Sequence, residues 1–366
     1  WASAELRAIM SYRDAFVEIM EFGRPELLPM FEWGYWPATL ERWRGEVMAA
    51  DAQPWDHFPI TWYEHAPVNL GICPAFEPEI LKDEGETFVQ RQTDGVVVRR
   101  RKDELSMPQW LEFPVKNHSD FNAILERLDP DTPGRYPADW DSRVEAWKTR
   151  DHFLTPGAVQ VSFFGWPRSL MGVENLLVAY HDDPDLLHAM ASHHLDFLRT
   201  VLERELQDVE FDFAFIWEDM AYNSGPLIGP NMVREFMLPY YRELFDFLRA
   251  HGIRHIVLDS DGDITQLIPL FTEVGVDALL PFEVAANMDV RVVRENHPRL
   301  RIMGGIDKRA LAAGPGAIDA ELEAKLPVMF ASRGFIPSVD HHIPPDVSLD
   351  DFAHYLKRCR EIYADS

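Results

Sequence analysis

H-I-V-L-D-S-D-G-D, residues 255 to 263, is a short apolar run that ends in three carboxylates around one glycine. Its core, Ile256 to Leu258, is typical of a strand that is buried on both faces of a parallel sheet. Parallel strands that end in acidic residues and a glycine are where α/β enzymes place their catalytic groups. The run therefore predicts an α/β enzyme whose site includes Asp259 and Asp261, which share one face if the strand continues, while Asp263 caps the next helix.

Two other runs, one before and one after this one in the chain, also end in acidic residues or histidines. F-A-F-I-W-E-D-M, residues 213 to 220, ends in Glu218 and Asp219. G-F-I-P-S-V-D-H-H-I-P-P-D, residues 334 to 346, carries His341 and His342 after its apolar part. Because the carboxyl ends of parallel strands meet at one edge, we expect these groups at a common mouth.

Strand-like and helix-like segments alternate from residue 158 onward, and no G-x-G-x-x-G follows any of the strands. This alternation, with one earlier strand, predicts a (β/α)8 barrel, and an open doubly wound sheet is the alternative. The expected strands cover residues 27–33, 158–164, 211–217, 253–258, 278–282, 301–305 and 335–339. The expected helices between the later strands cover residues 188–206, 231–250, 264–273, 290–296 and 317–330.

The N-terminal third has a different pattern. Helices are expected over residues 1–22 and 39–46, and residues 50–115 are rich in proline and aromatic side chains. Within that region, residues 87–101 read as a β-hairpin, because Asp94-Gly95 is a strong two-residue turn signal. The simplest organisation is one barrel domain over residues 1–366, with residues 50–115 as an insertion that carries the hairpin.

Composition restricts the partners. The formal charge of −26 argues against nucleic acid and anionic membrane surfaces. No apolar stretch approaches the ~18 residues that span a bilayer, and two distant cysteines, Cys73 and Cys359, exclude a disulfide framework. We therefore expect a cytoplasmic protein that acts on a small molecule.

Several runs, taken in order, resemble the uroporphyrinogen decarboxylase superfamily, in particular its branch of cobamide-dependent methyltransferase-like proteins. The resemblance implies a (β/α)8 barrel with its site at the carboxyl ends of the strands. The runs are F-E-W-G-Y-W-P-A-T-L-E-R-W, S-L-M-G-V-E-N-L-L-V-A-Y-H-D-D-P-D-L-L-H, I-W-E-D-M-A-Y-N-S-G-P-L-I, G-G-I-D-K-R and V-D-H-H-I-P-P-D-V-S.

The chain departs from both branches of that superfamily. Where the decarboxylases carry an arginine-rich run that grips substrate carboxylates, this chain has E-W-G-Y-W, residues 32 to 36, which argues against uroporphyrinogen as substrate. Where the methyltransferases carry a zinc site with two cysteines, this chain has Asp259, Asp261 and His341, with His342 as the alternative. The resemblance thus implies an O/N ligand set that could hold zinc or a harder divalent ion.

These patterns assign roles to individual residues. Glu218, Glu32 and Asp261 are the candidate acids, and Lys308 in G-G-I-D-K-R is expected to begin a solvated helix. Asp219 is a weaker candidate than Glu218, because it could equally cap the following turn. The candidate substrate-binding residues are Trp33, Tyr35, Trp36, Arg168, Tyr222 and Asn223.

The first functional hypothesis is an enzyme that moves a methyl group from a small methoxylated or methylated substrate to a corrinoid carrier protein, which would hold the cobalamin. The second is decarboxylation or related acid–base chemistry on a small carboxylic acid, bound by Arg168 and by Arg99 to Arg101 if these fold over the mouth. The third is a non-catalytic subunit that binds a ligand or a corrinoid protein. The resemblance also makes a homodimer an expectation.

Overall fold

Five short parallel strands form the central sheet of the computed structural model, which describes residues 10–46, 48–103, 107–157 and 161–366. Their spatial order, β13-β12-β11-β10-β7, follows their order along the chain. At least one helix connects each pair of neighbours, as parallel pairing requires. The strands are β7 (Ala214–Trp217), β10 (Ile256–Asp259), β11 (Ala278–Leu280), β12 (Arg301–Met303) and β13 (Phe335–Ile336).

The remaining segments continue this sheet around the barrel. β1 (Tyr63–His65) pairs in parallel with β6 (Phe153–Thr155), and the Asp212 N–H donates to the Leu154 carbonyl to link β6 with β7. At the other edge, Tyr35 forms a parallel bridge with Ile343, which follows β13. The predicted TIM-barrel-like (β/α)8 fold is confirmed.

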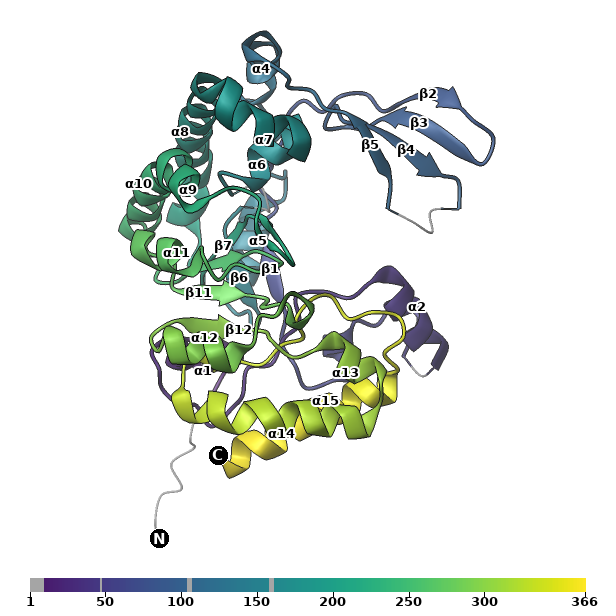
Figure 1. Ribbon diagram of the computed structural model, residues 1–366, viewed down its shortest axis with the longest axis vertical. Helices are drawn as coiled ribbons and strands as arrows, with labels where there is room; N and C mark the ends of the chain where they lie inside the picture. The colour runs from purple at the N-terminus through teal and green to yellow at the C-terminus, as the bar shows by residue number, and fades with distance from the viewer. Residues whose placement is uncertain (1–9, 47, 104–106, 158–160) are drawn as a thin grey trace.

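Helices cover the outside of the strands, as Figure 1 shows. The longest of them, α8, begins after the N-cap Asp183, whose side chain accepts the Leu186 N–H, and has proline at its first position. The helices are α1 (Tyr12–Met20), α2 (Pro37–Glu46), α3 (Pro54–His57), α4 (His118–Ile124), α5 (Trp140–Trp147), α6 (Gly165–Met171), α7 (Val173–Asp182), α8 (Pro184–Asp208), α9 (Pro230–Phe236), α10 (Leu238–Ala250), α11 (Ile268–Val274), α12 (Val290–Asn296), α13 (Lys308–Ala312), α14 (Pro315–Ser332) and α15 (Leu349–Asp365). Among the described residues, none of these helices combines the length and apolar character that crossing a membrane requires.

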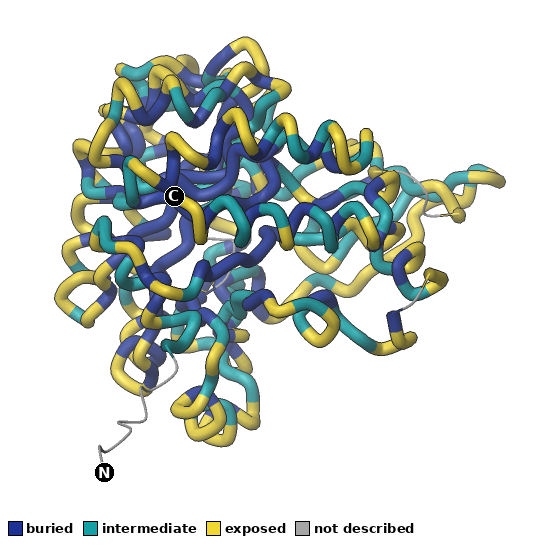
Figure 2. The backbone as a smooth tube through the Cα atoms, turned by 90° about the horizontal axis from the view of Figure 1, so that it is seen from below, coloured by how far each residue is buried: buried dark blue, intermediate teal, exposed yellow. Residues whose placement is uncertain are grey.

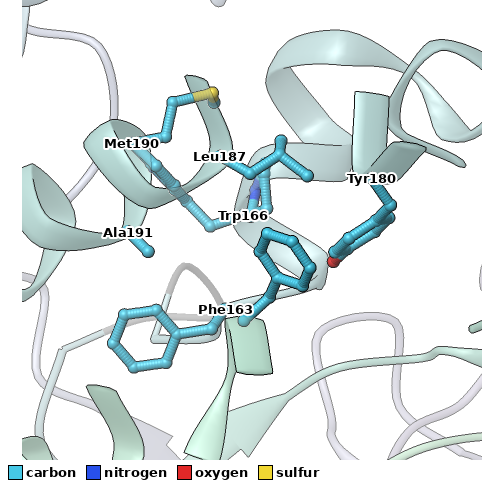
Figure 3. A pocket seen from close by; sticks show the side chains of 8 residues that line it. Phe163, Trp166, Tyr180, Leu187, Met190 and Ala191 are labelled. Atoms are coloured by element: carbon cyan, nitrogen blue, oxygen red, sulfur yellow. The ribbon is translucent and has the colours of Figure 1, made fainter. Parts of the chain in front are cut away.

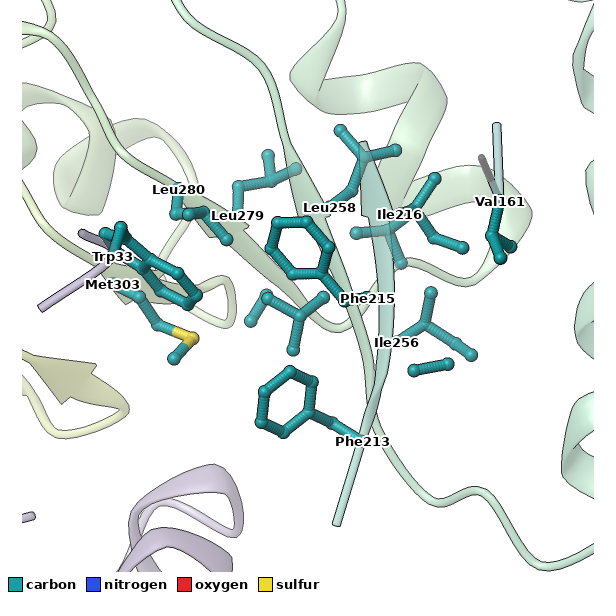
Figure 4. Packing of buried hydrophobic residues seen from close by; sticks show 14 of the residues in the cluster. Trp33, Val161, Phe213, Phe215, Ile216, Ile256, Leu258, Leu279, Leu280 and Met303 are labelled. Atoms are coloured by element: carbon teal, nitrogen blue, oxygen red, sulfur yellow. The ribbon is translucent and has the colours of Figure 1, made fainter. Parts of the chain in front are cut away.

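The core fills the barrel and the layer between strands and helices, where the buried chain lies in Figure 2. Phe213, Phe215, Leu280 and Met303 belong to it, and Figure 4 shows them packed together with Trp33. Fully burying one such side chain stabilises the fold by roughly 1.5–3 kcal/mol. Strands this short therefore depend on side-chain packing as much as on their ladders of hydrogen bonds.

Some element boundaries differ from expectation for local reasons. Of the strand expected over residues 158–164, residues 158–160 lie outside the described part and residues 161–164 are not a strand, because β6 takes that place in the barrel. The helix expected over residues 231–250 breaks at Met237, because Pro239 lacks the N–H that a continuous helix needs there.

A four-stranded antiparallel sheet extends away from the barrel (Figure 1). The predicted hairpin over residues 87–101 is confirmed as its two central strands. The sheet occupies a narrower range than the expected insertion of residues 50–115, which also contains β1 of the barrel. Its strands are β2 (Glu79–Asp83), β3 (Thr87–Arg91), β4 (Val97–Arg101) and β5 (Gln109–Glu112).

Candidate functional site

Side-chain direction in the barrel strands decides which residues reach the mouth. Phe215 of β7 stacks on Trp33 with ring centroids 5.9 Å apart, and its centroid lies 6.0 Å from that of Tyr63. These contacts join strands that are not neighbours, so Phe215 points into the barrel (Figure 4). Because alternate residues of a strand share a face, Trp217 also points inward, and so does its register partner Asp259.

Four carboxylates gather at this mouth: Asp219, Asp259, Asp261 and Glu283. Burial and then the neighbouring charges of Asp261, Asp219 and Glu283 raise the pKa of Asp259 well above its ordinary value. Burial also raises the pKa of Asp219, against the opposing effect of Arg168. The carboxylates at the end of β10 therefore repel one another, and this repulsion adds to burial in favouring the protonated form of Asp259.

Two cations at the mouth are already paired. The Arg168 guanidinium donates to the carbonyl and to Oδ2 of Asp219, at 2.5 and 2.9 Å, and lies 4.7 Å from the ring centroid of Trp217. Nζ of Lys308 lies 3.1 Å from Oε1 of Glu283 and 3.8 Å from Oδ1 of Asp340. Within the described residues, the Asp259 carboxylate has neither an ion pair nor a hydrogen bond.

His341 and His342 face the same mouth beside an aromatic ring. Nε2 of His341 lies 3.6 Å from Oδ2 of Asp261, and this pairing raises the pKa of His341. The Trp36 ring stacks along His341, at 6.4 Å between centroids, and meets His342 edge-on at 5.9 Å. A side-chain carbon at Gly34 would lie 2.6 Å from Nε2 of His342, so this glycine permits the close approach.

Removing the charge of Asp261 should therefore change the pKa of His341. In Asp261→Asn we expect the pKa of His341 to fall, because the carboxylate that favours the imidazolium is lost. Titration of the imidazole C2 proton by NMR measures this. His354, which pairs with Asp319 elsewhere, is the internal control and should not change. An unchanged His341 titration would contradict the pairing.

Glu218 points away from the mouth, toward the helices. Its carboxylate accepts the N–H groups of Phe163, Phe164 and Gly165, at 2.8–2.9 Å, and the Tyr241 hydroxyl. Burial raises the pKa of Glu218 to about 7. Since Glu218 follows the inward Trp217, strand alternation directs it outward, where it fixes the start of α6. Its catalytic role stays a prediction that this geometry does not favour.

An apolar pocket lies on the same helical side of β7 (Figure 3). Phe163, Trp166 and Tyr180 line it together with side chains of α8 and α9. It contains no charged side chain, and Phe163 connects it to Glu218 rather than to Asp259. The mouth therefore stays the candidate site, since the lining of this pocket offers no charged group for catalysis.

Glu32 and Tyr35 also lie outside the barrel interior. Oε2 of Glu32 accepts from the Ser338 hydroxyl and the Val339 N–H, at 2.7 and 2.8 Å, and burial raises its pKa to about 7. The Tyr35 ring packs edge-on against Trp43 and Phe352 of α2 and α15. Of the run Trp33 to Trp36, the structure thus brings only the two tryptophans to the interior and the mouth.

The hairpin after β7 approaches the mouth through its backbone. The Asp263 N–H donates to the Tyr222 carbonyl at 2.8 Å, and the side chains of Tyr222 and Asn223 are exposed. Asp263 accepts the Thr265 N–H in a local turn, and α11 begins only at Ile268, so it does not cap that helix. Binding roles for Tyr222 and Asn223 stay predictions.

The expected metal ligands lie close together without forming a ligand set. Among the described residues, no three His, Cys, Asp or Glu side chains converge as metal ligands. Nε2 of His341 and Oδ2 of Asp261 lie 3.6 Å apart, and within the described part of the chain no third side chain of these types completes a ligand group with them. The divalent metal stays a prediction.

Glu283 and Lys308 were not among the predicted site residues. Glu283 carried the same signal as the others, since it follows the apolar run of β11 by three residues. Lys308 does begin a helix, as expected, but its side chain turns back to Glu283 and Asp340 instead of to solvent. Sequence periodicity does not reveal that direction.

Comparisons with known proteins bear on the fold and the family of the chain. A methyltransferase from Methanosarcina mazei has a similar structure, with a TM-score of 0.61 and 13% identity over 97% of this chain and 100% of that chain, a likeness that shows the shared fold. No curated protein matches the sequence. The family model of uroporphyrinogen decarboxylase (URO-D) matches residues 160–362, which carry β7 to β13 and the whole acidic mouth. The chain therefore belongs to the uroporphyrinogen decarboxylase family.

Proposed function

We propose that this protein is a methyltransferase-like enzyme that takes a methyl group from a small methylated substrate and passes it to a corrinoid protein. The observation that carries the proposal is the acidic mouth, where Asp259 has no cationic partner among the described residues. The family membership and the fold shared with a methyltransferase support it.

The charge of the mouth disfavours decarboxylation. A carboxylate substrate needs a free cation, but Arg168 is paired with Asp219 and Lys308 with Glu283. Arg99 and Arg101 lie on β4 of the extended sheet, paired with Glu84 and Asp103, and so do not cover the barrel. An anionic substrate would meet repulsion that nothing described at the mouth offsets.

The same charge restricts the leaving group in methyl transfer. When the bond from the methyl carbon to its heteroatom breaks, the heteroatom keeps the electron pair, and an anion left beside Asp259, Asp261 and Glu283 would be repelled. The substrate must therefore be protonated at the heteroatom or carry a positive charge there already. Asp259, whose pKa is raised, could hold the proton for the first route.

The chain's own residues would bind and orient the donor. Trp36, which is 40% exposed, offers a ring face at the mouth, and Trp33 with Tyr63 forms an aromatic layer within the barrel. A reduced corrinoid supplies a strong nucleophile for methyl groups, and in this proposal the partner protein carries it. This chain would contribute position, charge and exclusion of water.

A methyl-transfer assay tests the proposal. Purified protein, a panel of methylated donors and reduced cobalamin are mixed, and formation of methylcobalamin is followed by absorbance. We expect transfer from at least one uncharged or cationic donor and none from carboxylates. Absence of transfer with every donor, even after a corrinoid protein is added to the assay, would favour the non-catalytic binding subunit.

Trp36→Ala should weaken donor binding without unfolding the protein. The ring stacks on His341 and is partly exposed, so its loss removes binding contacts and little of the core. An aromatic contact of this kind is worth ~0.5–1.5 kcal/mol, so KM should rise by up to about tenfold. The matched control is Trp110→Ala, a tryptophan of β5 that is 51% exposed. Equal KM values in the two variants would remove Trp36 from the site.

A further inference from the structure

The mouth has more negative than positive groups, and as a result one carboxylate, that of Asp259, has no ion pair among the described residues. Asp219 pairs with Arg168, Glu283 and Asp340 share Lys308, and Asp261 lies beside His341. Asp259 lies among them, in electrostatic contact with Asp261, Asp219 and Glu283, and the one cation that acts on it, Arg168, is itself paired with Asp219. A carboxylate that is removed from water without an ion pair costs free energy that a bound cation would offset.

Aromatic side chains lie near the same position. Tyr63 is close enough to Asp259 for their charges to interact, and its ring centroid lies 5.4 Å from that of Trp33. Trp217 points inward beside Asp259 and already carries one cation on its face, the Arg168 guanidinium at 4.7 Å. The mouth thus contains one completed example of a cation held between an aromatic ring and a carboxylate.

A second, independent feature indicates a ligand. Trp33 is only 8% exposed and its indole N–H has no hydrogen-bond partner among the described residues. The ring lies inside the barrel (Figure 4). It packs near Tyr63, which interacts electrostatically with Asp259. A buried donor without an acceptor costs about 1–3 kcal/mol, which a hydroxyl or ether oxygen of a bound molecule would offset.

From this juxtaposition we infer that the methyl donor is an onium compound, a small quaternary ammonium or sulfonium ion that also bears an oxygen acceptor. The inference rests on the proposed methyl transfer and names its substrate class. Asp259 and the ring faces would hold the charged head, and Trp33 would donate to the oxygen. Neutral methyl ethers fit less well, because they would need a proton from this cluster and leave it with one more unpaired negative charge.

The chemistry of such a donor balances without an acid or a metal. The methyl carbon forms its new bond with an electron pair of the nucleophile, a reduced corrinoid of the partner protein. The bond from carbon to nitrogen or sulfur breaks with its pair on the heteroatom, so an ammonium leaves as a neutral amine and a sulfonium as a neutral thioether. No proton is transferred, and the leaving group is not repelled by the carboxylates.

Binding of two probes of the same shape tests the charge requirement. Choline and 3,3-dimethylbutan-1-ol differ in that a carbon replaces the charged nitrogen, and both carry a hydroxyl group. With the full chain, isothermal titration calorimetry should show choline binding at least about tenfold more tightly, as a desolvated cation–π contact and a carboxylate provide. Tetramethylammonium, which lacks the hydroxyl, should bind more weakly than choline but still measurably.

Two variants test whether Asp259 is responsible for the preference for choline. Asp259→Asn should remove the preference for choline, whereas Asp263→Asn, an equal loss of charge in a local turn outside the cluster, should keep it. Circular dichroism establishes that both variants are folded. Equal affinities for the two probes, no binding of either cation, or a preference that survives in Asp259→Asn would each overturn the inference.

These results are separable from the proposed function. Methyl transfer from a neutral methyl ether, without cation binding, would leave the proposed function standing and refute the onium donor. Tight choline binding without any transfer to a corrinoid would refute the proposed methyl transfer and leave a binding site for onium ions standing.

Discussion

Asp259→Asn should lower kcat/KM for methyl transfer by at least about a hundredfold while the protein stays folded. The side chain points into the barrel mouth, pairs with no cation among the described residues, and lies among three other carboxylates. Loss of one preorganised electrostatic contact to the reacting group commonly reduces the rate by about 10²–10³. Asparagine keeps the shape of the side chain and removes its charge, so the change in kcat/KM measures the contribution of that charge.

The division between KM and kcat identifies how Asp259 acts. A residue that binds a cationic donor should change KM more than kcat, and a residue that donates a proton should change kcat. Thermal unfolding is the control: because the change removes one of several repelling carboxylates, the midpoint should stay level or rise. Wild-type kcat/KM in this variant would refute the assignment of the site.

Glu32→Gln should stabilise the protein at neutral and alkaline pH by up to roughly 3 kcal/mol. Burial between the barrel and α15 raises the pKa of Glu32 from 4.5 to about 7. The folded state therefore keeps a proton that the unfolded state releases, so the contribution of Glu32 to stability is full below pH 4.5 and is lost as the pH rises to about 7. A difference of about two and a half pKa units corresponds to roughly 3 kcal/mol.

Glutamine can accept from Ser338 and Val339 as Glu32 does, and it has no charge to bury. Urea unfolding at several pH values should show the variant and the wild type equally stable near pH 4, with the variant ahead above pH 7. Glu41→Gln, at an exposed position of α2, should follow the wild type throughout. If the advantage of Glu32→Gln does not grow with pH, burial does not raise the pKa of Glu32 in the folded protein.

The alternation of apolar strands and helices predicted a parallel α/β fold, because a strand covered on both faces needs neither turn chemistry nor long-range information to be recognised. It left the open doubly wound sheet as an alternative, and the family resemblance implied the barrel. The endings of those strands gave Asp259, Asp261 and His341. The sequence did not reveal which way the individual side chains point. Glu218 and Trp217 are adjacent in sequence and opposite in space, and only the contacts of Phe215 with Trp33 and Tyr63 show which of them faces inward.

The same limit explains the other differences. Glu32 lies beside the inward Trp33 and therefore turns outward to Ser338, so its aromatic neighbours in sequence do not make it a mouth residue. Lys308 reaches the mouth because the chain after β12 brings it beside Asp340, residues that are 32 positions apart. A contact between segments that distant depends on the assembled barrel.

Isotope labelling distinguishes methyl transfer from decarboxylation most directly. A donor that carries ¹³C in its methyl group, and a second donor that carries ¹³C in a carboxylate, are each incubated with the protein and reduced corrinoid. For a methyltransferase we expect NMR to find the methyl label on the corrinoid, with a demethylated product, in the wild type and not in Asp259→Asn, and no labelled carbon dioxide from either protein. Labelled carbon dioxide with every methyl group retained would contradict methyl transfer and assign this acidic mouth to decarboxylation.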